Sequence, residues 1–100
     1  MIKPTVGRVV WYYPSTTAYP EITDKSGRPI ATSGDQPLAA LVASVHNDRL
    51  VNLGGFDADG RTFSRLSVIL MQEGDQVPKT GSYCTWMPYQ IGQAKKHEGQ

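Results

Sequence analysis

The side chains best suited to chemistry in this sequence are aromatic rings and arginines, which together can bind a flat, phosphorylated ligand. A ring can stack on a planar base, and a guanidinium group can bind a phosphate through two parallel hydrogen bonds. We expect Tyr12, Trp86 or Tyr89 to stack on a base and Arg65 to contact phosphate. The candidate ligand-binding residues are Arg8, Trp11, Tyr12, Tyr13, Asn52, Phe63, Arg65, Ser67, Trp86 and Tyr89, with Arg61 and Thr85 as further members.

No arrangement of residues in the sequence predicts catalysis or a metal centre. His46 is expected to belong to a polar turn, and the other histidine, His97, lies in a polar tail. The stretch Asp57–Gly60 begins like a calcium-binding loop but lacks the spacing and the closing glutamate, so it predicts a turn. Cys84 has no histidine nearby in sequence and is expected to be a buried structural thiol. We therefore expect neither enzyme activity nor a cofactor.

Short segments rich in β-branched and aromatic residues, separated by turn residues, predict five strands. Pro14 should end the first strand, because proline cannot donate a hydrogen bond to a sheet. Gly54–Gly55 indicates a bend, a bulge or a close approach of two backbones. The predicted strands are Val6–Tyr13, Leu38–Val45, Arg49–Phe56, Arg61–Leu70 and Tyr83–Met87. This pattern predicts an all-β fold, a small SH3-like or OB-like antiparallel barrel of about five strands.

The predicted strands belong to one domain over residues 1–100, interrupted by one long loop. Ser15–Gln36 is rich in Ser, Thr, Pro, Gly and charged residues, and loops of this length are usually functional or mobile. Gln93–Gln100 is polar and is expected to be a flexible tail.

Alternation along the first predicted strand suggests which aromatic rings leave the core. Successive strand residues point to opposite faces, so three adjacent aromatics cannot all face inward. Arg8 and Tyr12 share one face, and an unpaired arginine is costly to bury. We therefore expect Val9 and Trp11 to face the core and Tyr12 to face outward, while Tyr13 at the strand end can take either side.

The same argument applied to the fourth predicted strand yields a mixed outer surface. Leu66, Val68 and Leu70 share a face that becomes apolar toward its end, and we expect this face to be inside. An aromatic ring, a cation and a hydroxyl would then lie outside, namely Phe63, Arg65 and Ser67. On the preceding strand, Asn52 is a polar residue among apolar neighbours.

Charge and apolar content restrict the partners that the sequence predicts. Ten basic and nine acidic residues give a net charge of +1 without a basic block, which argues against a duplex-DNA binder. The single cysteine rules out an intrachain disulfide. The apolar run Leu38–Val45 is far shorter than the roughly 20 residues of a membrane helix, and there is no leader pattern. We expect a soluble, intracellular protein, a modest core and a homo-oligomer.

Three pieces of the sequence carry a resemblance to a set of small proteins of tailed bacteriophages. They are P-T-V-G-R-V-V-W-Y-Y-P near the start, V-N-L-G-G-F-D-A-D-G with S-R-L-S-V in the middle, and T-W-M-P-Y-Q-I-G-Q-A near the end. The resemblance covers Pro4–Pro14 and roughly Pro37–Ala94, and it skips the loop Ser15–Gln36. It implies a phage-encoded accessory protein with an SH3-like barrel, acting in the cytoplasm of the infected host.

One role that this resemblance suggests is evasion of host defence without catalysis. Some phage proteins of similar size are sponges that oligomerise and sequester the cyclic nucleotide signals of CBASS immunity. This link is an analogy with phage proteins of similar size, and it agrees with the outward aromatics and the near-neutral charge expected above. The alternatives are a protein-interaction or structural module of a phage, and a weak binder of single-stranded nucleic acid.

Overall fold

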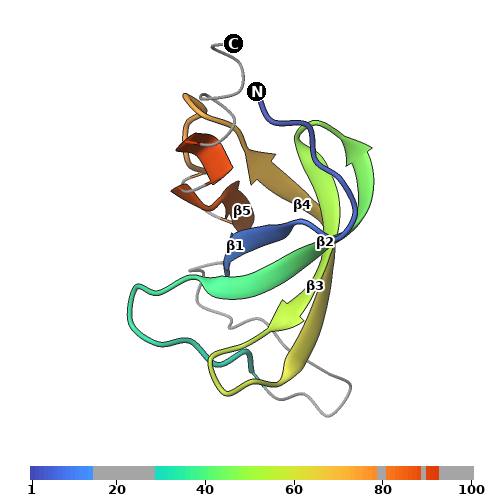
Figure 1. Ribbon diagram of the computed structural model, residues 1–100. Helices are drawn as coiled ribbons and strands as arrows, with labels where there is room; N and C mark the ends of the chain where they lie inside the picture. The colour runs from blue at the N-terminus through green and yellow to red at the C-terminus, as the bar shows by residue number, and fades with distance from the viewer. Residues whose placement is uncertain (15–28, 79–80, 89, 93–100) are drawn as a thin grey trace.

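The structure is a computed structural model that describes residues 1–14, 29–78, 81–88 and 90–92. There the chain forms a closed barrel of five strands: β1 (Val9–Tyr13), β2 (Leu38–Asn47), β3 (Leu50–Phe56), β4 (Thr62–Met71) and β5 (Tyr83–Trp86) (Figure 1). The prediction of a small all-β barrel of five strands is confirmed. Most of the predicted long loop, and the predicted tail, lie outside the described residues.

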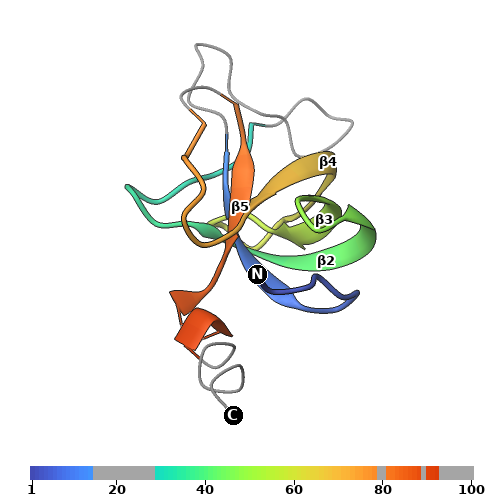
Figure 2. The same ribbon diagram turned by 90° about the horizontal axis from the view of Figure 1, so that it is seen from above.

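Strands that are consecutive in the sequence are neighbours in the barrel, and β5 closes the ring by pairing with β1 (Figure 2). This order is a closed meander and not the Greek key of an OB-fold. Four pairings are antiparallel, and the pairing of β4 with β5 is parallel. One parallel pair is unavoidable, because neighbours cannot alternate direction all the way around a ring with an odd number of strands. The chain between Met71 and Tyr83 therefore crosses from one end of the barrel to the other.

The orientation of β1 is the reverse of the sequence prediction. Val10 and Tyr12 point into the barrel and are fully buried, whereas Trp11 is half-buried on the outer side. The strand begins at Val9, after a tight turn in which Gly7 has a φ of +92°. Arg8 therefore lies before the strand and stays exposed, so it places no constraint on the face that Tyr12 occupies.

The predicted face of β4 is right near its end and wrong near its start. Val68 and Leu70 are buried as expected, but Phe63 is buried too and Leu66 is 77% exposed. A register shift in the β3–β4 pairing lies between these two halves, and Ser67 within it has a φ of +55°. A β-bulge of this kind adds one unpaired residue, so the side chains beyond it swap faces.

Asn52 pairs with the backbone at this bulge. Its amide oxygen accepts a hydrogen bond from the N–H of Ser67 (2.8 Å), and its amide nitrogen donates to the hydroxyl of Ser44 (2.9 Å). His46 Nε2 lies 3.0 Å from the same Asn52 oxygen and must donate, because an amide oxygen only accepts. The Asn52 side chain, which the sequence predicts to bind a ligand, therefore forms hydrogen bonds within the barrel instead.

The turn between β3 and β4 is organised by one buried carboxylate, Asp57. Its oxygens accept hydrogen bonds from the backbone N–H groups of Arg61 (2.9 Å), Asp59 (3.0 Å) and Ala31 (3.2 Å). Gly60 completes the turn with a φ of +83°. Burial alone would raise the pKa of Asp57, but the three N–H donors and the nearby Arg61 guanidinium outweigh it and lower the pKa. The D-A-D-G stretch is therefore a turn that also ties Ala31 to the barrel.

We expect the thermal stability of this protein to fall in acid, because the pKa values of Asp57 and Asp75 are lowered in the folded state. Such a carboxyl stabilises the fold above its unfolded pKa, about 3.9, and that stabilisation is lost as the pH falls through the folded pKa. The melting temperature, followed by circular dichroism, should be level down to about pH 5 and decline below about pH 4.

The variant Asp57→Asn separates this effect from general acid unfolding. It should melt about 5–10 °C lower than the wild type at neutral pH and lose less stability on acidification. An acid decline as steep as that of the wild type would show that Asp57 does not contribute to it.

Candidate functional site

Three of the predicted ligand-binding aromatics belong to the hydrophobic core. Tyr12 and Phe63 form a tilted pair with ring centroids 5.3 Å apart, and Trp86 is buried as well. These rings pack against the other core residues and cannot offer an outer face to a base. The expectation that Tyr12, Phe63 and Trp86 face outward is therefore wrong. For Tyr12 and Phe63 the causes are the strand start and the bulge described above.

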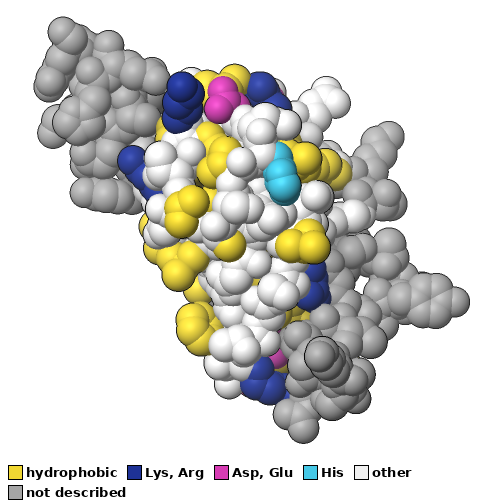
Figure 3. Space-filling view, turned by 90° about the vertical axis from the view of Figure 1, so that its right-hand side faces the viewer, with side chains coloured by type: hydrophobic (Ala, Val, Ile, Leu, Met, Phe, Trp, Pro, Cys, Tyr) yellow, Lys and Arg dark blue, Asp and Glu magenta, His cyan; other side chains and the backbone are white. Residues whose placement is uncertain are grey.

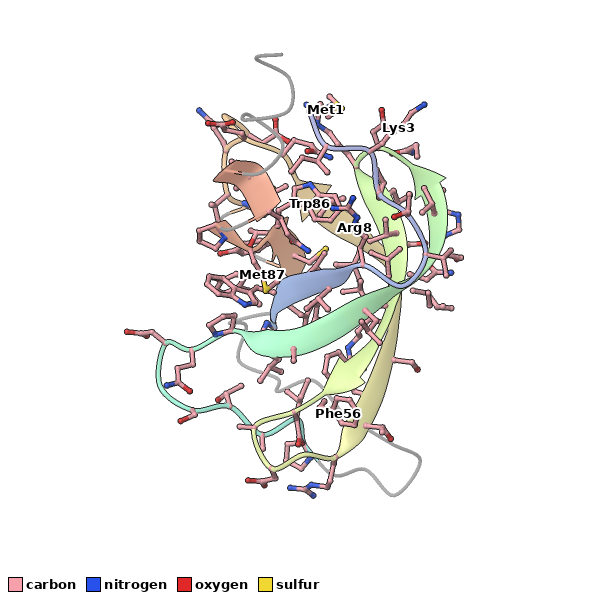
Figure 4. All side chains as sticks on the ribbon, in the orientation of Figure 1. Met1, Lys3, Arg8, Phe56, Trp86 and Met87 are labelled. Atoms are coloured by element: carbon pink, nitrogen blue, oxygen red, sulfur yellow. The ribbon has the colours of Figure 1, made fainter. Side chains whose placement is uncertain are left out.

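Two of the candidate arginines, Arg8 and Arg65, lie over aromatic rings of the barrel itself, a contact that the sequence did not predict. The guanidinium carbon of Arg8, the residue before β1, lies 6.0 Å from the centre of the Trp86 ring (Figure 4). Arg65 covers Phe63 in the same way at 5.5 Å. Arg61 forms an ion pair with Asp59 at 2.7 Å. Each of these cations therefore stabilises the fold through a neighbour of its own, and the three do not converge on one phosphate site.

The remaining candidates are scattered. Trp11 is half-buried on the outside of β1, opposite Ala39 and Thr85 on the flanking strands. Asn52 and Ser67 are brought together at the bulge. Tyr13 lies at the end of β1 and contacts a ring that was not among the candidates, Tyr83. Tyr89 lies outside the described residues.

Two surfaces could instead serve as a functional site, and the first is the outer face of β2 with its flanks. The inward side chains Leu38, Ala40 and Val42 are apolar, but so are Ala39, Leu41 and Ala43, which are exposed. A strand that is apolar on both faces is typical of a sheet covered on both sides. We call this surface the outer apolar face and define it by Val6, Val9, Ala39, Leu41, Ala43 and Phe56.

Two hollows shape the outer apolar face. In Figure 3, hydrophobic side chains, drawn in yellow, follow the left side of the view. The larger hollow, of about 410 Å³, extends from Val6 to Thr62, and a smaller one of about 170 Å³ lies by Val9. Phe56 is 51% exposed and lines both hollows. No described residue that lines either hollow carries a charge.

The second surface is a cavity of about 490 Å³ at the end of β1 and the start of β5. Tyr13 and Tyr83 are direct cross-strand partners there, and their rings stack with centroids 4.9 Å apart and planes at 15°. Burial raises the pKa of Tyr83, and the neighbouring Tyr13 raises it further. We call this the Tyr13–Tyr83 cavity, which is lined by Tyr13, Pro14, Thr32, Gly34, Asp35, Gln36, Val77, Pro78, Gly81 and Tyr83.

Reactive groups elsewhere in the described residues do not form a further site. Cys84 is buried as predicted, and burial raises its pKa to about 12, so the sulfur is a thiol and not a thiolate at neutral pH. Among the described ranges, no three His, Cys, Asp or Glu side chains cluster closely enough to hold a metal ion. The same ranges contain no helix with the length and apolar character needed to cross a membrane.

Sequence reasoning missed both surfaces, although one of them left a signal. The run Leu38–Val45 is mostly apolar at odd and even positions alike, which distinguishes it from a strand with one solvent-exposed face. Tyr83 left no comparable signal, because its contact with Tyr13 depends on how two distant strands align. The chain matches no family model, no curated protein and no solved structure.

Proposed function

We propose that this protein is a non-catalytic interaction module whose outer apolar face binds a second copy of the same chain. The observation that supports this proposal is the apolar character of β2 on both of its sides. Exposed apolar patches of this kind usually mark a protein contact. An isologous dimer buries the patch on both subunits at once.

A second copy fits this face better than a charged partner does. The described residues that line the two hollows are uncharged, so a charged group that enters them would lose hydration without gaining an ion pair there. The face also carries an exposed aromatic ring, Phe56, beside two hollows. In a two-fold arrangement, the Phe56 ring of each subunit can enter a hollow of the other.

The proposal is tested by measuring the mass of the protein in solution over a wide dilution series. We expect a reversible dimer, and the variant Leu41→Lys should raise its dissociation constant at least about tenfold, or about 1.4 kcal/mol, by burying a charge in the interface. The matched control is Ile69→Lys, because Ile69 is 43% exposed and Leu41 is 45% exposed. Ile69 lies on β4 and lines neither hollow.

The control should dimerise as the wild type does, and both variants should keep the circular dichroism spectrum of the barrel. A wild type that is monomeric at every concentration would contradict the proposal. Equal weakening of the dimer by Leu41→Lys and Ile69→Lys would contradict the choice of surface.

A phage origin, action in the host cytoplasm and sequestration of a cyclic nucleotide signal of CBASS immunity are further proposals, and they rest on the resemblance of the sequence alone. The residues first expected to bind such a ligand include three core rings, Tyr12, Phe63 and Trp86. A place where a base could bind is offered by the Tyr13–Tyr83 cavity instead.

A further inference from the structure

The Tyr13–Tyr83 cavity has the size and the walls of a small-molecule site. Its volume of about 490 Å³ falls in the usual range for such sites, roughly 300–1,000 Å³. Two aromatic rings and the prolines Pro14 and Pro78 form apolar walls, and Thr32, Asp35 and Gln36 add polar groups among the described lining residues. This combination of apolar walls with a few convergent polar groups favours a small organic ligand.

The stacked tyrosines determine how a flat ligand can bind. Their centroids are 4.9 Å apart, which is already the contact distance of two rings, so no third ring fits between them. A planar ligand must pack against the pair from the side of the cavity. Tyr83 keeps its phenolic proton at neutral pH, since its pKa is raised, and its hydroxyl is therefore a hydrogen-bond donor as well as an acceptor.

The charge of the described lining residues distinguishes among planar ligands. Asp35 is the charged side chain among the described lining residues, and it is an anion. Thr32 and Gln36 add a hydroxyl and an amide. A carboxylate accepts hydrogen bonds from N–H groups and repels phosphate, so the lining favours a ring that carries amino groups and disfavours an anion.

We propose that the Tyr13–Tyr83 cavity binds a planar nitrogen heterocycle that is neutral or cationic and carries an amino group, as a free nucleobase or nucleoside does. The ring packs against the tyrosine pair, and the amino group faces Asp35. This site is independent of self-association, because it shares no lining residue with the two hollows of the outer apolar face.

The test is a titration of the full-length isotope-labelled protein with adenosine, cytidine, uridine and adenosine monophosphate, followed by NMR chemical shifts. Adenosine and cytidine should shift the signals of Tyr13 and Tyr83, uridine should bind more weakly because it has no amino group, and the monophosphate should bind more weakly than adenosine. Tyr83→Leu should weaken adenosine binding about tenfold, whereas Tyr83→Phe keeps the ring and should retain binding.

Asp35→Asn tests the charge argument and should narrow the difference between adenosine and its monophosphate. The proposal is overturned if no nucleoside shifts these signals, or if the monophosphate binds as tightly as adenosine. Leu41→Lys should bind adenosine as the wild type does. A loss of dimerisation with intact adenosine binding would therefore leave this inference standing, and a dimer without adenosine binding would refute it alone.

Discussion

Replacing Gly55 with alanine is expected to destabilise the barrel by about 3 kcal/mol, enough to unfold a large fraction of a marginally stable domain. Gly55 is buried in β3 directly opposite Ala40 of β2. A Cβ atom at this position would collide with the carbonyl oxygen of Ala39 and would lie 2.9 Å from the Cα of Ala40. Both atoms are backbone, so β2 and β3 would have to move apart where they pair. Denaturant unfolding followed by circular dichroism measures the loss.

The neighbouring glycine provides the matched control. A Cβ atom on Gly54 would meet nothing within 4 Å, and its φ is not in the left-handed region. Gly54→Ala should therefore change the free energy of unfolding by less than about 0.5 kcal/mol. Because Gly54 lines the larger hollow, both variants are compared at a protein concentration at which the wild type is monomeric. Equal destabilisation by the two substitutions would mean that the close approach of the β2 backbone is not what excludes a Cβ atom at Gly55.

The positions of the strands could be predicted because local residues fix where strands end. Pro14 follows the last residue of β1, and the turns at Asn47–Arg49 and Asp57–Gly60 separate the three strands of the meander. In the first of these turns the Asn47 side chain accepts a hydrogen bond from the N–H of Arg49 (2.8 Å). Such interactions span only a few residues, so the sequence displays them directly.

The faces of the strands could not be predicted from alternation, because two local breaks reset it. The turn at Gly7 separates Arg8 from the strand, and the bulge at Ser67 reverses the side chains before it relative to those after it. The turn has a signal in Gly7, because glycine is the usual residue at a positive φ, but the bulge has none, since serine at a positive φ is uncommon. Counting Arg8 as part of the first strand exchanged Trp11 for Tyr12 in the predicted core, and overlooking one extra residue in β4 exchanged Leu66 for Phe63.

The candidate site depended on these faces and on pairings between distant strands, so it was the least predictable part. The contact between Tyr13 and Tyr83 requires the ring to close between the first strand and the last. The outer apolar face likewise combines Val6, β2 and the end of β3. Residue types suggested that aromatic rings and arginines bind a ligand together, but they did not indicate that Arg8 and Arg65 lie over the barrel's own buried rings.

Gln72 is the buried polar residue that joins three separate segments at one end of the barrel. Its side-chain oxygen accepts hydrogen bonds from the Trp86 indole N–H (3.1 Å) and from the backbone N–H of Ile2 (3.2 Å). Its side-chain nitrogen donates to the carbonyl oxygens of Ile2 (2.9 Å) and Asp48 (2.8 Å). All four hydrogen-bonding positions of the amide are thus used, and β5, the N-terminal segment and the β2–β3 turn are connected through one side chain.

Gln72→Leu is therefore expected to lower the free energy of unfolding by about 3 kcal/mol, although leucine fits the volume. The substitution leaves the Trp86 indole N–H buried without this acceptor, and it also removes both hydrogen bonds to Ile2. The matched control is Gln76→Leu, because Gln76 lies in the same connection and is exposed, so its replacement should change stability by less than about 0.5 kcal/mol. Denaturant unfolding of the two variants under the same conditions gives both values. If Gln72→Leu is as stable as Gln76→Leu, these four hydrogen bonds contribute nothing net, and closure of the barrel rests on its apolar core alone.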